Sequence, residues 1–492
     1  MKRAYIRPAK THQSQLTEEQ EICPIYKKCS GCQMQNLPYP DQLRWKQSQV
    51  KKLLGRYGSI PFIIGMAHPY HYRNKVQVAF GRTRAGKTVT GIWQSKEQRI
   101  AITDSCMIED RAGAEIAATL RRLLPAFKLA VWDPRTGQGF FRHLLVRRAV
   151  KTGQLMVVLV GATPVFPQKA ALTKALLKAH PDITTVVFVV NDQPTNLLLG
   201  QREEVLYGPG YIEDQLCGLT FRISPRSFYQ VNPTQTEILY QKAIQFAGLT
   251  GTETVIDAYC GIGTIGMCAA AHAGQVIGVE SNPAAVRDAR ENARRNGVKN
   301  IQFTAADAGR YLTEMAESGL KADVLLMDPP RAGSDRRFLS AVLKMQPGRI
   351  VYISCNPETQ ARDLAVLVRG GYQVKKIQPV DMFPWTHHVE CVVSFSKGDI
   401  STKNIRVEFP LDEMDMEGFL ADGTYKQIQE YVLEHTGLKV SALYIAQVKA
   451  KHGIIERENY NKPKTEGNRV PKCPPEKEKA IEDAMKHFGM IP

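Results

Sequence analysis

The 492-residue sequence has no apolar run as long as a membrane span and few cysteines for its length. A helix that crosses a bilayer needs about 20 consecutive apolar residues, and the polar N-terminus, MKRAYIRPAKTHQSQLTEEQ, has no signal-peptide core. Ten cysteines exclude a disulfide-rich scaffold. With 43% hydrophobic and 23% charged residues, collagen-like and wholly disordered chains are excluded too. We therefore expect a cytoplasmic globular protein without a membrane partner.

Charge of one sign dominates only part of the chain. The whole sequence carries +17, with 65 Lys+Arg against 48 Asp+Glu. Residues 1–215 contribute +15 of this, residues 216–400 contribute +3, and residues 401–492 contribute −1. A basic half joined to a near-neutral half is typical of a nucleic-acid-binding protein. A generally basic, solubilising surface is the alternative.

Pattern and composition divide the chain into five regions. From residue 252 to 397 short apolar runs alternate with helical segments, which predicts an α/β fold with a doubly wound parallel sheet. The residues before it read as a mixed α+β region, and those after it as helices over 424–435, 441–452 and 476–488. The predicted regions are a flexible basic leader (1–20), a cysteine region (21–65, with Cys106), a central domain (66–215), the doubly wound domain (216–398) and a helical C-terminal extension (399–492).

A glycine-rich loop follows the first strand of the doubly wound region. In VIDAYCGIGTIG (255–266) the strand ends in Asp257, and Gly261 and Gly263 follow. Glycine lets the backbone approach a ligand closely. Glu280 ends the next strand, QVIGVE, where a carboxylate can hold ribose hydroxyls. This arrangement predicts a site for a nucleoside-containing cofactor, the alternative being a structural glycine turn.

Two further strand ends carry reactive groups. In MDPPR (327–331), Asp328 ends a hydrophobic strand and is a candidate site residue. The alternative is a structural turn stiffened by proline. Cys355 follows the strand of RIVYISCNPET (349–359), and Asn356 and Pro357 open the next helix. The partial positive charge of a helix N-terminus favours a thiolate, the nucleophilic form. We predict Cys355 as a nucleophile; an inert buried thiol is the alternative.

An acidic residue begins the last apolar strand. Glu390, in PWTHHVECVVSFS (384–396), is costly there unless it is paired, protonated or functional. It is a candidate general base, and the alternative is a solvated strand start. His387 and His388 are rival bases.

Four cysteines suggest a metal site. Cys23, Cys29 and Cys32 lie in CPIYKKCSGC, and Cys106 is the nearest remaining cysteine. Four thiolates suit either zinc or an iron–sulfur cluster. The alternative is a set of free thiols.

Taken together, these motifs resemble the RNA uracil-5-methyltransferase family, which makes 5-methyluridine with S-adenosylmethionine. The resemblance covers about residues 21–398 and rests on the cysteine set and on SFYQVNP (227–233), DAYCGIGTIG (257–266), DPPRAG (328–333), SCNP (354–357) and HHVECV (387–392). It implies a Rossmann-like class I methyltransferase domain. The cysteine spacing is similar to that of the iron–sulfur subgroup, which methylates 23S ribosomal RNA. It therefore favours a [4Fe–4S] cluster on Cys23, Cys29, Cys32 and Cys106 over zinc.

The resemblance also implies roles for single residues. Cys355 would be the nucleophile that attacks carbon 6 of uracil, and Glu390 the base that removes the carbon-5 proton. The implied S-adenosylmethionine-binding residues are Gln230, Tyr259, Thr264, Glu280, Asp307 and Asp328. The expected partner is ribosomal RNA, bound by the basic half of the chain, with the target uridine flipped out of its stack. The enzyme is expected to be a monomer.

Competing functions remain open from the sequence. A transfer-RNA uridine-5 methyltransferase would use the same chemistry. A cytosine-5 RNA methyltransferase also uses cysteine, but tends to place it after a Pro-Cys loop, where this chain has DPPR. A metal-bearing RNA-binding protein without catalysis is a third class. The C-terminal helices 424–435 and 441–452 could form a helix-turn-helix-like pair, for RNA contact or for packing.

Overall fold

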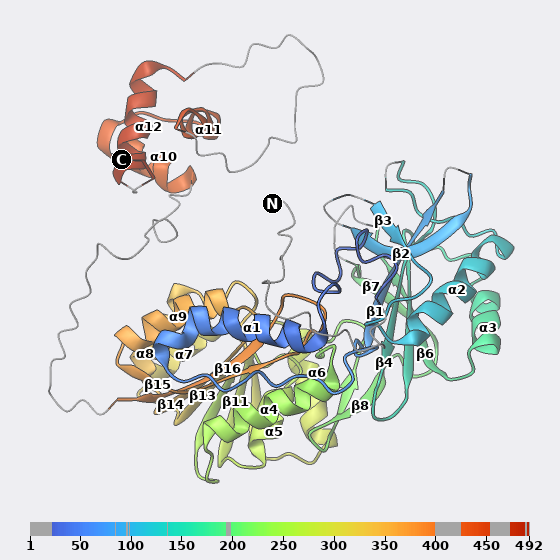
Figure 1. Cartoon of the computed structure of the whole chain (residues 1–492), viewed down its shortest axis with the longest axis horizontal. Coiled ribbons are helices and arrows are strands. Elements are labelled where there is room, and N and C mark those ends of the chain that lie inside the picture. Colours follow the sequence, from blue (N-terminus) through green and yellow to red (C-terminus); the bar gives the residue numbers. More distant parts are fainter. Residues whose placement is uncertain are drawn as a thin grey trace. The chain divides into compact units, whose positions relative to one another are not determined.

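The computed structural model describes residues 22–83, 85–94, 97, 99–134, 136–192, 198–398, 425–452, 473–487 and 490–491. The chain divides into two compact units, Met1–Asp399 and Ile400–Pro492 (Figure 1). The predicted leader (1–20) lies outside the described residues. Within the described part of the chain, no helix combines the length and the apolarity needed to cross a bilayer.

The first helix belongs to the cysteine region by sequence but packs on the doubly wound domain. Helix α1 (Tyr39–Leu54), followed by the short 3-10 helix Gly55–Tyr57, begins at Pro38 with proline in its first turn (Figure 1). Its apolar residues Val50 and Leu54 are fully buried, in the same core cluster as Ile256 and Met327. Helix α1 thus covers the sheet that carries the predicted catalytic residues.

The central domain is a mixed seven-stranded sheet in the order β3-β2-β1-β4-β5-β6-β7. Neighbouring strands are antiparallel except for β5 and β6, and α2 and α3 share one core cluster with the sheet. The apolar run TNLLLG (195–200) predicts a further strand. That prediction is wrong for Leu198–Gly200, which form no strand, and 195–197 lie outside the described residues. The elements are β1 (Lys75–Arg82), β2 (Thr88–Gln94), β3 (Arg99–Ile102), α2 (Arg111–Ala126), β4 (Phe141–Arg148), β5 (Leu155–Gly161), α3 (Lys169–Ala179), β6 (Ile183–Val190) and β7 (Arg202–Tyr207).

A two-stranded hairpin and a capped helix lead into the doubly wound domain. Strands β8 (Ile212–Leu216) and β9 (Leu219–Ile223) pair antiparallel, and β8 crosses the domain boundary that the sequence places at 215/216. Helix α4 (Pro233–Ala247) starts where Asn232-Pro233 predicts, because the Asn232 side chain accepts a hydrogen bond from the first turn.

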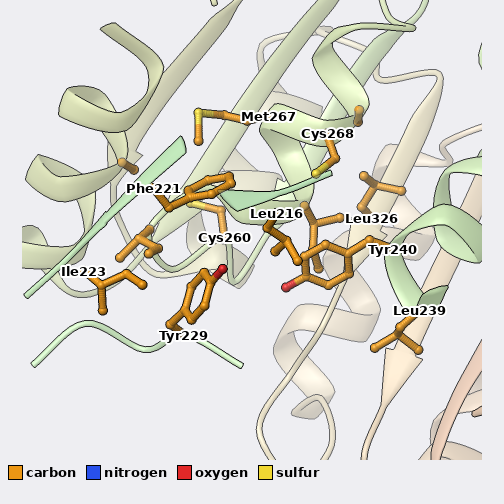
Figure 2. Close-up of a cluster of buried hydrophobic side chains, with 14 of the residues drawn as sticks. Leu216, Phe221, Ile223, Tyr229, Leu239, Tyr240, Cys260, Met267, Cys268 and Leu326 are labelled. Carbon is orange, nitrogen blue, oxygen red and sulfur yellow. The ribbon is translucent and has the colours of Figure 1, made fainter. Parts of the chain in front are cut away.

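The doubly wound prediction is confirmed by a seven-stranded sheet in the order β12-β11-β10-β13-β14-β16-β15. Strands from β12 to β14 are parallel, and β16 lies antiparallel between β14 and β15. Each face carries its own core: Val255 of β10 belongs to one cluster, drawn in Figure 2, and the next residue, Ile256, to the other. The elements are β10 (Thr254–Ala258), α5 (Thr264–Ala270), β11 (Gln275–Glu280), α6 (Pro283–Arg295), β12 (Ile301–Ala305), α7 (Ala308–Glu317), β13 (Val324–Met327), α8 (Arg336–Met345), β14 (Arg349–Ser354), α9 (Pro357–Arg369), β15 (Tyr372–Val380) and β16 (Glu390–Lys397).

The second unit contains the three predicted helices. They are α10 (Tyr425–Thr436), α11 (Ala442–Lys451) and α12 (Pro475–His487). Buried Ile428 of α10, Ile445 of α11 and Ile481 of α12 lie in one core cluster. The α10–α11 pair is therefore completed by a third helix.

Candidate active site

The predicted site residues follow the carboxyl ends of adjacent parallel strands. Strand β10 pairs with β13 so that Ala258 lies opposite Met327, which puts Tyr259 and Asp328 side by side. On its other edge β10 pairs with β11, where Ala258 lies opposite Val279 and Glu280 follows. Ligands of open α/β sheets bind outside the carboxyl ends of the strands, at the point where the strand order reverses.

The glycine loop leaves room beside a buried carboxylate. Gly261 has a φ of +55°, and a Cβ built there would meet no described atom within 4 Å. The Gly261 N–H donates to Oε2 of Glu280 at 3.2 Å. Asp257 accepts a 2.8 Å hydrogen bond from the Gly266 N–H at Oδ2, while its buried Oδ1 has no partner among the described residues. Open space over Gly261, with the Glu280 carboxylate bonded to the same residue, fits the hydroxyl groups of a nucleoside cofactor.

The other predicted cofactor residues differ in where they lie and in how far their polar groups are engaged. Tyr259, between the strand and the loop, has a left-handed backbone with a φ of 65°. The Thr264 hydroxyl lies 3.0 Å from the Tyr240 hydroxyl. Asp307 is exposed and caps α7 with its side chain. Gln230 is partly buried, two residues before the Asn232 cap of α4.

Strand pairing brings Cys355 and Glu390 together. In the antiparallel β14–β16 pair, Ser354 lies opposite Cys391, so the next positions along the two strands are Cys355 and Glu390. Glu390 is 3% exposed, and Cys355 is partly exposed. Asp328 ends the neighbouring strand β13. Residues far apart in the chain thus form a cluster of one thiol and two carboxyl groups.

Burial governs the protonation of this cluster. Burial, together with the charges of Glu390 and Asp328 and against the opposing charge of Arg331, raises the pKa of Cys355 to about 11. Burial, followed by the Asp328 charge, raises the pKa of Glu390 well above its usual value, and burial raises the pKa of Asp328 to about 7. The helix N-terminus is expected to favour a Cys355 thiolate, but in the free site desolvation and the nearby carboxyl groups raise the pKa of the thiol.

Arg331 joins the three loops of the cluster, and the sequence reasoning assigned it no role. Its carbonyl oxygen accepts hydrogen bonds from Asn356 Nδ2 and Thr359 Oγ1, both at 3.2 Å. Its guanidinium lies 2.8 Å from Nε2 of His388, and its charge lowers the pKa of Cys355. The signal in the sequence was its place three residues after Asp328, on a loop at a strand's carboxyl end.

The two histidines proposed as rival bases have different surroundings. His388 uses Nε2 for Arg331, and burial together with that charge lowers its pKa to about 4. It therefore stays neutral at physiological pH. His387 is exposed, and its ring centroid lies 4.9 Å from that of Trp45 on α1.

The four cysteines gather in one region of the first unit. Burial raises the pKa values of Cys29, Cys32 and Cys106, and charge on a neighbouring cysteine raises each of them further. Cys32 and Cys106 pack against the same cluster, formed by Tyr72, Ile108 and Trp385. The donor type fits an iron–sulfur cluster or zinc. The placement does not, since in the described part of the chain no three His, Cys, Asp or Glu side chains are close enough to hold a metal ion.

Comparison with known proteins agrees with this geometry. Residues 200–398 match the family model described as tRNA (Uracil-5-)-methyltransferase. An uncharacterized RNA methyltransferase of Halalkalibacterium halodurans is 45% identical over 75% of this chain and 82% of that protein, and one of Oceanobacillus iheyensis is 43% identical over 75% and 81%. The crystal structure of Pyrococcus abyssi tRNA (uracil-54, C5)-methyltransferase in complex with S-adenosyl-L-homocysteine has a TM-score of 0.63 and 28% identity, covering 74% of this chain and 86% of that one. The chain belongs to the RNA uracil-5-methyltransferase family.

Proposed function

We propose that this protein methylates carbon 5 of a uridine in 23S ribosomal RNA with S-adenosylmethionine. The observation that carries the proposal is the β14–β16 register, which sets a partly exposed thiol beside a buried carboxyl group. Methylation at carbon 5 needs both groups. The thiol adds to carbon 6 to activate carbon 5, and a base must later remove the carbon-5 proton.

S-adenosylmethionine supplies a methyl group on an electrophilic sulfonium. Glu280 lies at a strand end where it can hold the ribose hydroxyls, and Asp257 is braced against the glycine loop. Tyr259, Thr264, Asp307, Gln230 and Asp328 complete the proposed binding set. The open space over Gly261 supports this assignment.

Different residues of the cluster carry out the nucleophilic attack and the proton abstraction. Arg331 stabilises the Cys355 thiolate, which attacks carbon 6 of the extruded uracil to form a covalent adduct. After methylation at carbon 5, Glu390 accepts the carbon-5 proton, and the Cys355–carbon 6 bond breaks. A carboxylate whose pKa is raised by burial is a stronger base once ionised, which suits this abstraction.

Activity should be tested with Cys355→Ala and Glu390→Gln. We expect Cys355→Ala to form no 5-methyluridine and no adduct. Glu390→Gln should hold RNA in an adduct that survives denaturing electrophoresis. Cys473→Ala, in the second unit, is the matched control and should behave as wild type. Normal turnover by Cys355→Ala would favour an RNA-binding protein without catalysis, and 5-methylcytidine as product would favour the cytosine enzyme.

The choice of 23S ribosomal RNA rests on the resemblance to the iron–sulfur subgroup. Transfer RNA is the second candidate, favoured by the family model's description and by the Pyrococcus abyssi neighbour. Mapping 5-methyluridine in both RNA pools of a deletion strain decides between them. Loss from transfer RNA alone would overturn the ribosomal assignment.

We further propose that Cys23, Cys29, Cys32 and Cys106 bind a [4Fe–4S] cluster. The gathering of four thiols in one region supports it, although binding must draw them closer together than in this structure. The purified protein should be brown and contain iron and sulfide, and Cys29→Ser should lose both. Stoichiometric zinc instead would refute the cluster. We expect the protein to act as a cytoplasmic monomer.

A further inference from the structure

The segment that leads into Glu390 adopts an unusual backbone conformation. We call Asp381–Val389 the Glu390 loop; it joins β15 to β16. At its centre Trp385 is 1% exposed and has a left-handed φ of 69°. A bulky residue rarely adopts this conformation, so the surrounding structure must hold it there.

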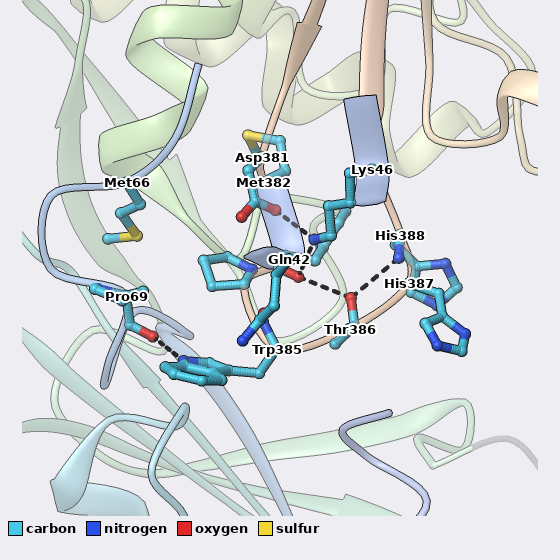
Figure 3. A network of polar contacts seen from close by, with 12 residues as sticks. Gln42, Lys46, Met66, Pro69, Asp381, Met382, Trp385, Thr386, His387 and His388 are labelled. Carbon is cyan, nitrogen blue, oxygen red and sulfur yellow. Dashed lines mark hydrogen bonds and ion pairs between the residues drawn. The ribbon is translucent and has the colours of Figure 1, made fainter. Parts of the chain in front are cut away.

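Trp385 is held by three other segments of the chain. Its carbonyl oxygen accepts hydrogen bonds from the N–H groups of Gln33 and Met34 at 3.1 and 3.0 Å. Its own N–H donates to Oε1 of Gln42 at 3.0 Å, and its indole N–H donates to the carbonyl of Pro69 at 2.7 Å (Figure 3). The polar groups of Trp385 are thus satisfied from outside the Glu390 loop.

One of these segments directly follows a predicted metal ligand, and another is hydrogen-bonded to the segment that carries Cys106 through His71 N–H and the Met107 carbonyl at 2.9 Å. We call Ile22–Leu37 the cysteine loop; Gln33 follows Cys32 directly. Pro69 precedes Tyr72, whose hydroxyl donates to the carbonyl of Pro384 at 3.0 Å. Cys32 and Cys106 both pack against Trp385 and Tyr72. Whatever orders the cysteines therefore also orders the support of Trp385.

Helix α1 anchors the start of the same loop. Lys46 and Asp381 form an ion pair at 2.6 Å, and both side chains are fully buried (Figure 3). The Lys46 ammonium also donates to the carbonyl of Phe383 at 3.0 Å, and the Tyr39 hydroxyl donates to Asp381 at 2.8 Å. With this end fixed by α1, the conformation at Trp385 decides the direction in which the chain continues.

The far end of the loop leads directly into the predicted base, Glu390. The Thr386 hydroxyl donates to the Phe383 carbonyl at 2.8 Å and accepts from the His388 N–H at 3.2 Å. Glu390 follows two residues later as the first residue of β16. A change at Trp385 is therefore transmitted over five residues to the predicted base.

We propose that the cysteine loop sets the position of Glu390 through Trp385, which makes Trp385 a positioning residue for the proton-abstraction step. The proposal rests on the function proposed above. It predicts a specific kinetic defect: when Trp385 or its support is weakened, the adduct still forms at Cys355 but is resolved slowly, because Glu390 is misplaced.

The test compares two steps in Gln42→Ala and Trp385→Phe. Gln42→Ala removes the acceptor of the Trp385 N–H, and Trp385→Phe removes the bond to Pro69 while keeping an aromatic ring. Gln49→Ala, the same change on a partly exposed face of α1, is the matched control. Adduct formation is followed by denaturing electrophoresis, and resolution by tritium release from RNA carrying [5-³H]uridine. We expect several-fold more adduct at steady state and slower tritium release, with the rate of adduct formation changed less than twofold.

A cysteine variant and a second measurement separate positioning from general damage. Cys32→Ser should produce the same accumulation of adduct. Backbone hydrogen exchange across 381–389 should be faster in Cys32→Ser, Trp385→Phe and Gln42→Ala than in Gln49→Ala. Equal losses in adduct formation and resolution, or no accumulation in either Trp385→Phe or Gln42→Ala, would overturn the inference. Failure of the wild type to form 5-methyluridine, with no adduct in Glu390→Gln, would instead refute the proposed function, so the two failures are distinguishable.

Discussion

At the scale of the residue, Arg331 allows the protonation of Cys355 to be tested. Its guanidinium is the cation that opposes the rise in the pKa of Cys355, and it is itself held by a neutral His388. The protonation of the thiol therefore depends on one side chain outside the predicted catalytic pair. The reactivity of the Cys355 thiol in the free protein, and the dependence of that reactivity on pH, should therefore depend on Arg331.

We predict that alkylation of Cys355 by iodoacetamide accelerates about tenfold per pH unit from pH 7 to pH 10. The sign follows from the raised pKa of about 11: the thiolate fraction is small at neutral pH and grows until that value is reached. An ordinary thiol with a pKa of about 8.5 would level off earlier.

Arg331→Gln should displace this profile to higher pH, because the opposing charge is lost. Peptide mass spectrometry at Cys355 measures both curves. A profile that levels off near pH 8.5, or one unchanged in Arg331→Gln, would contradict the account of the site.

Gly266 supplies a second test at the scale of one residue. A Cβ there would lie 2.7 Å from Oδ2 of Asp257, so Gly266→Ala must displace the carboxylate or break its 2.8 Å bond. We predict at least about tenfold weaker binding of S-adenosylmethionine, or ~1.4 kcal/mol, by calorimetry. Gly55→Ala is the control, since its Cβ would meet nothing within 4 Å and its φ is −60°. Equal affinity in Gly266→Ala would remove Asp257 from the cofactor site.

At the scale of the element, α1 is the part whose place the sequence did not indicate. Its sequence belongs to the basic first region, yet Val50 and Leu54 pack in the core of the doubly wound sheet. The buried Lys46–Asp381 pair fixes it to the loop before β16. An element from the predicted RNA-binding half therefore supports the catalytic half.

We predict that Lys46→Met lowers the stability of the first unit by about 3–5 kcal/mol, because it leaves Asp381 as a buried, unpaired charge. The double variant Lys46→Met/Asp381→Asn should lose less, since the charge goes with its partner. The midpoint of urea unfolding measures both. Lys51→Met, on the exposed face of α1, should change stability by less than about 0.5 kcal/mol. A double variant as unstable as Lys46→Met would argue against the buried-charge explanation.

At the scale of the whole molecule, the second unit differs from the first both in its separate core and in its lack of excess positive charge. The second unit has its own apolar cluster, with Ile428, Ile445 and Ile481 buried, and residues 401–492 carry a net charge of −1. The excess of +15 lies in residues 1–215. The second unit therefore contributes no net positive charge to an RNA interface.

We predict that a fragment of residues 400–492 folds alone and melts cooperatively by circular dichroism. We also predict that removing residues 399–492 leaves methylation within about twofold of the full chain. The slope of log affinity for RNA against log salt should be unchanged, because the slope follows the phosphates neutralised by basic residues. A shallower slope after truncation would place RNA contacts in the second unit.

The sequence was most informative where local signals decide structure. Apolar runs marked the strands of the doubly wound sheet, and Asn232 and Asn356 marked helix starts, because a side-chain cap needs only its own first turn. Strand β4 was missed because its arginines interrupt the apolar pattern. Arg147 is nonetheless buried, with its guanidinium donating to the Ser227 carbonyl at 2.6 Å.

By itself the sequence determined that Asp257, Asp328 and Cys355 would each lie at the carboxyl end of a strand, since a strand and its terminating loop are properties of a few consecutive residues. Only the tertiary structure decided which of these ends meet. Strand β16 inserts antiparallel between β14 and β15, and that pairing, not any local pattern, brings Glu390 to Cys355. The same holds for Arg331 against His388 and for the cysteine loop against Trp385. These contacts join residues distant in the chain, and their energy depends on packing that no single segment contains.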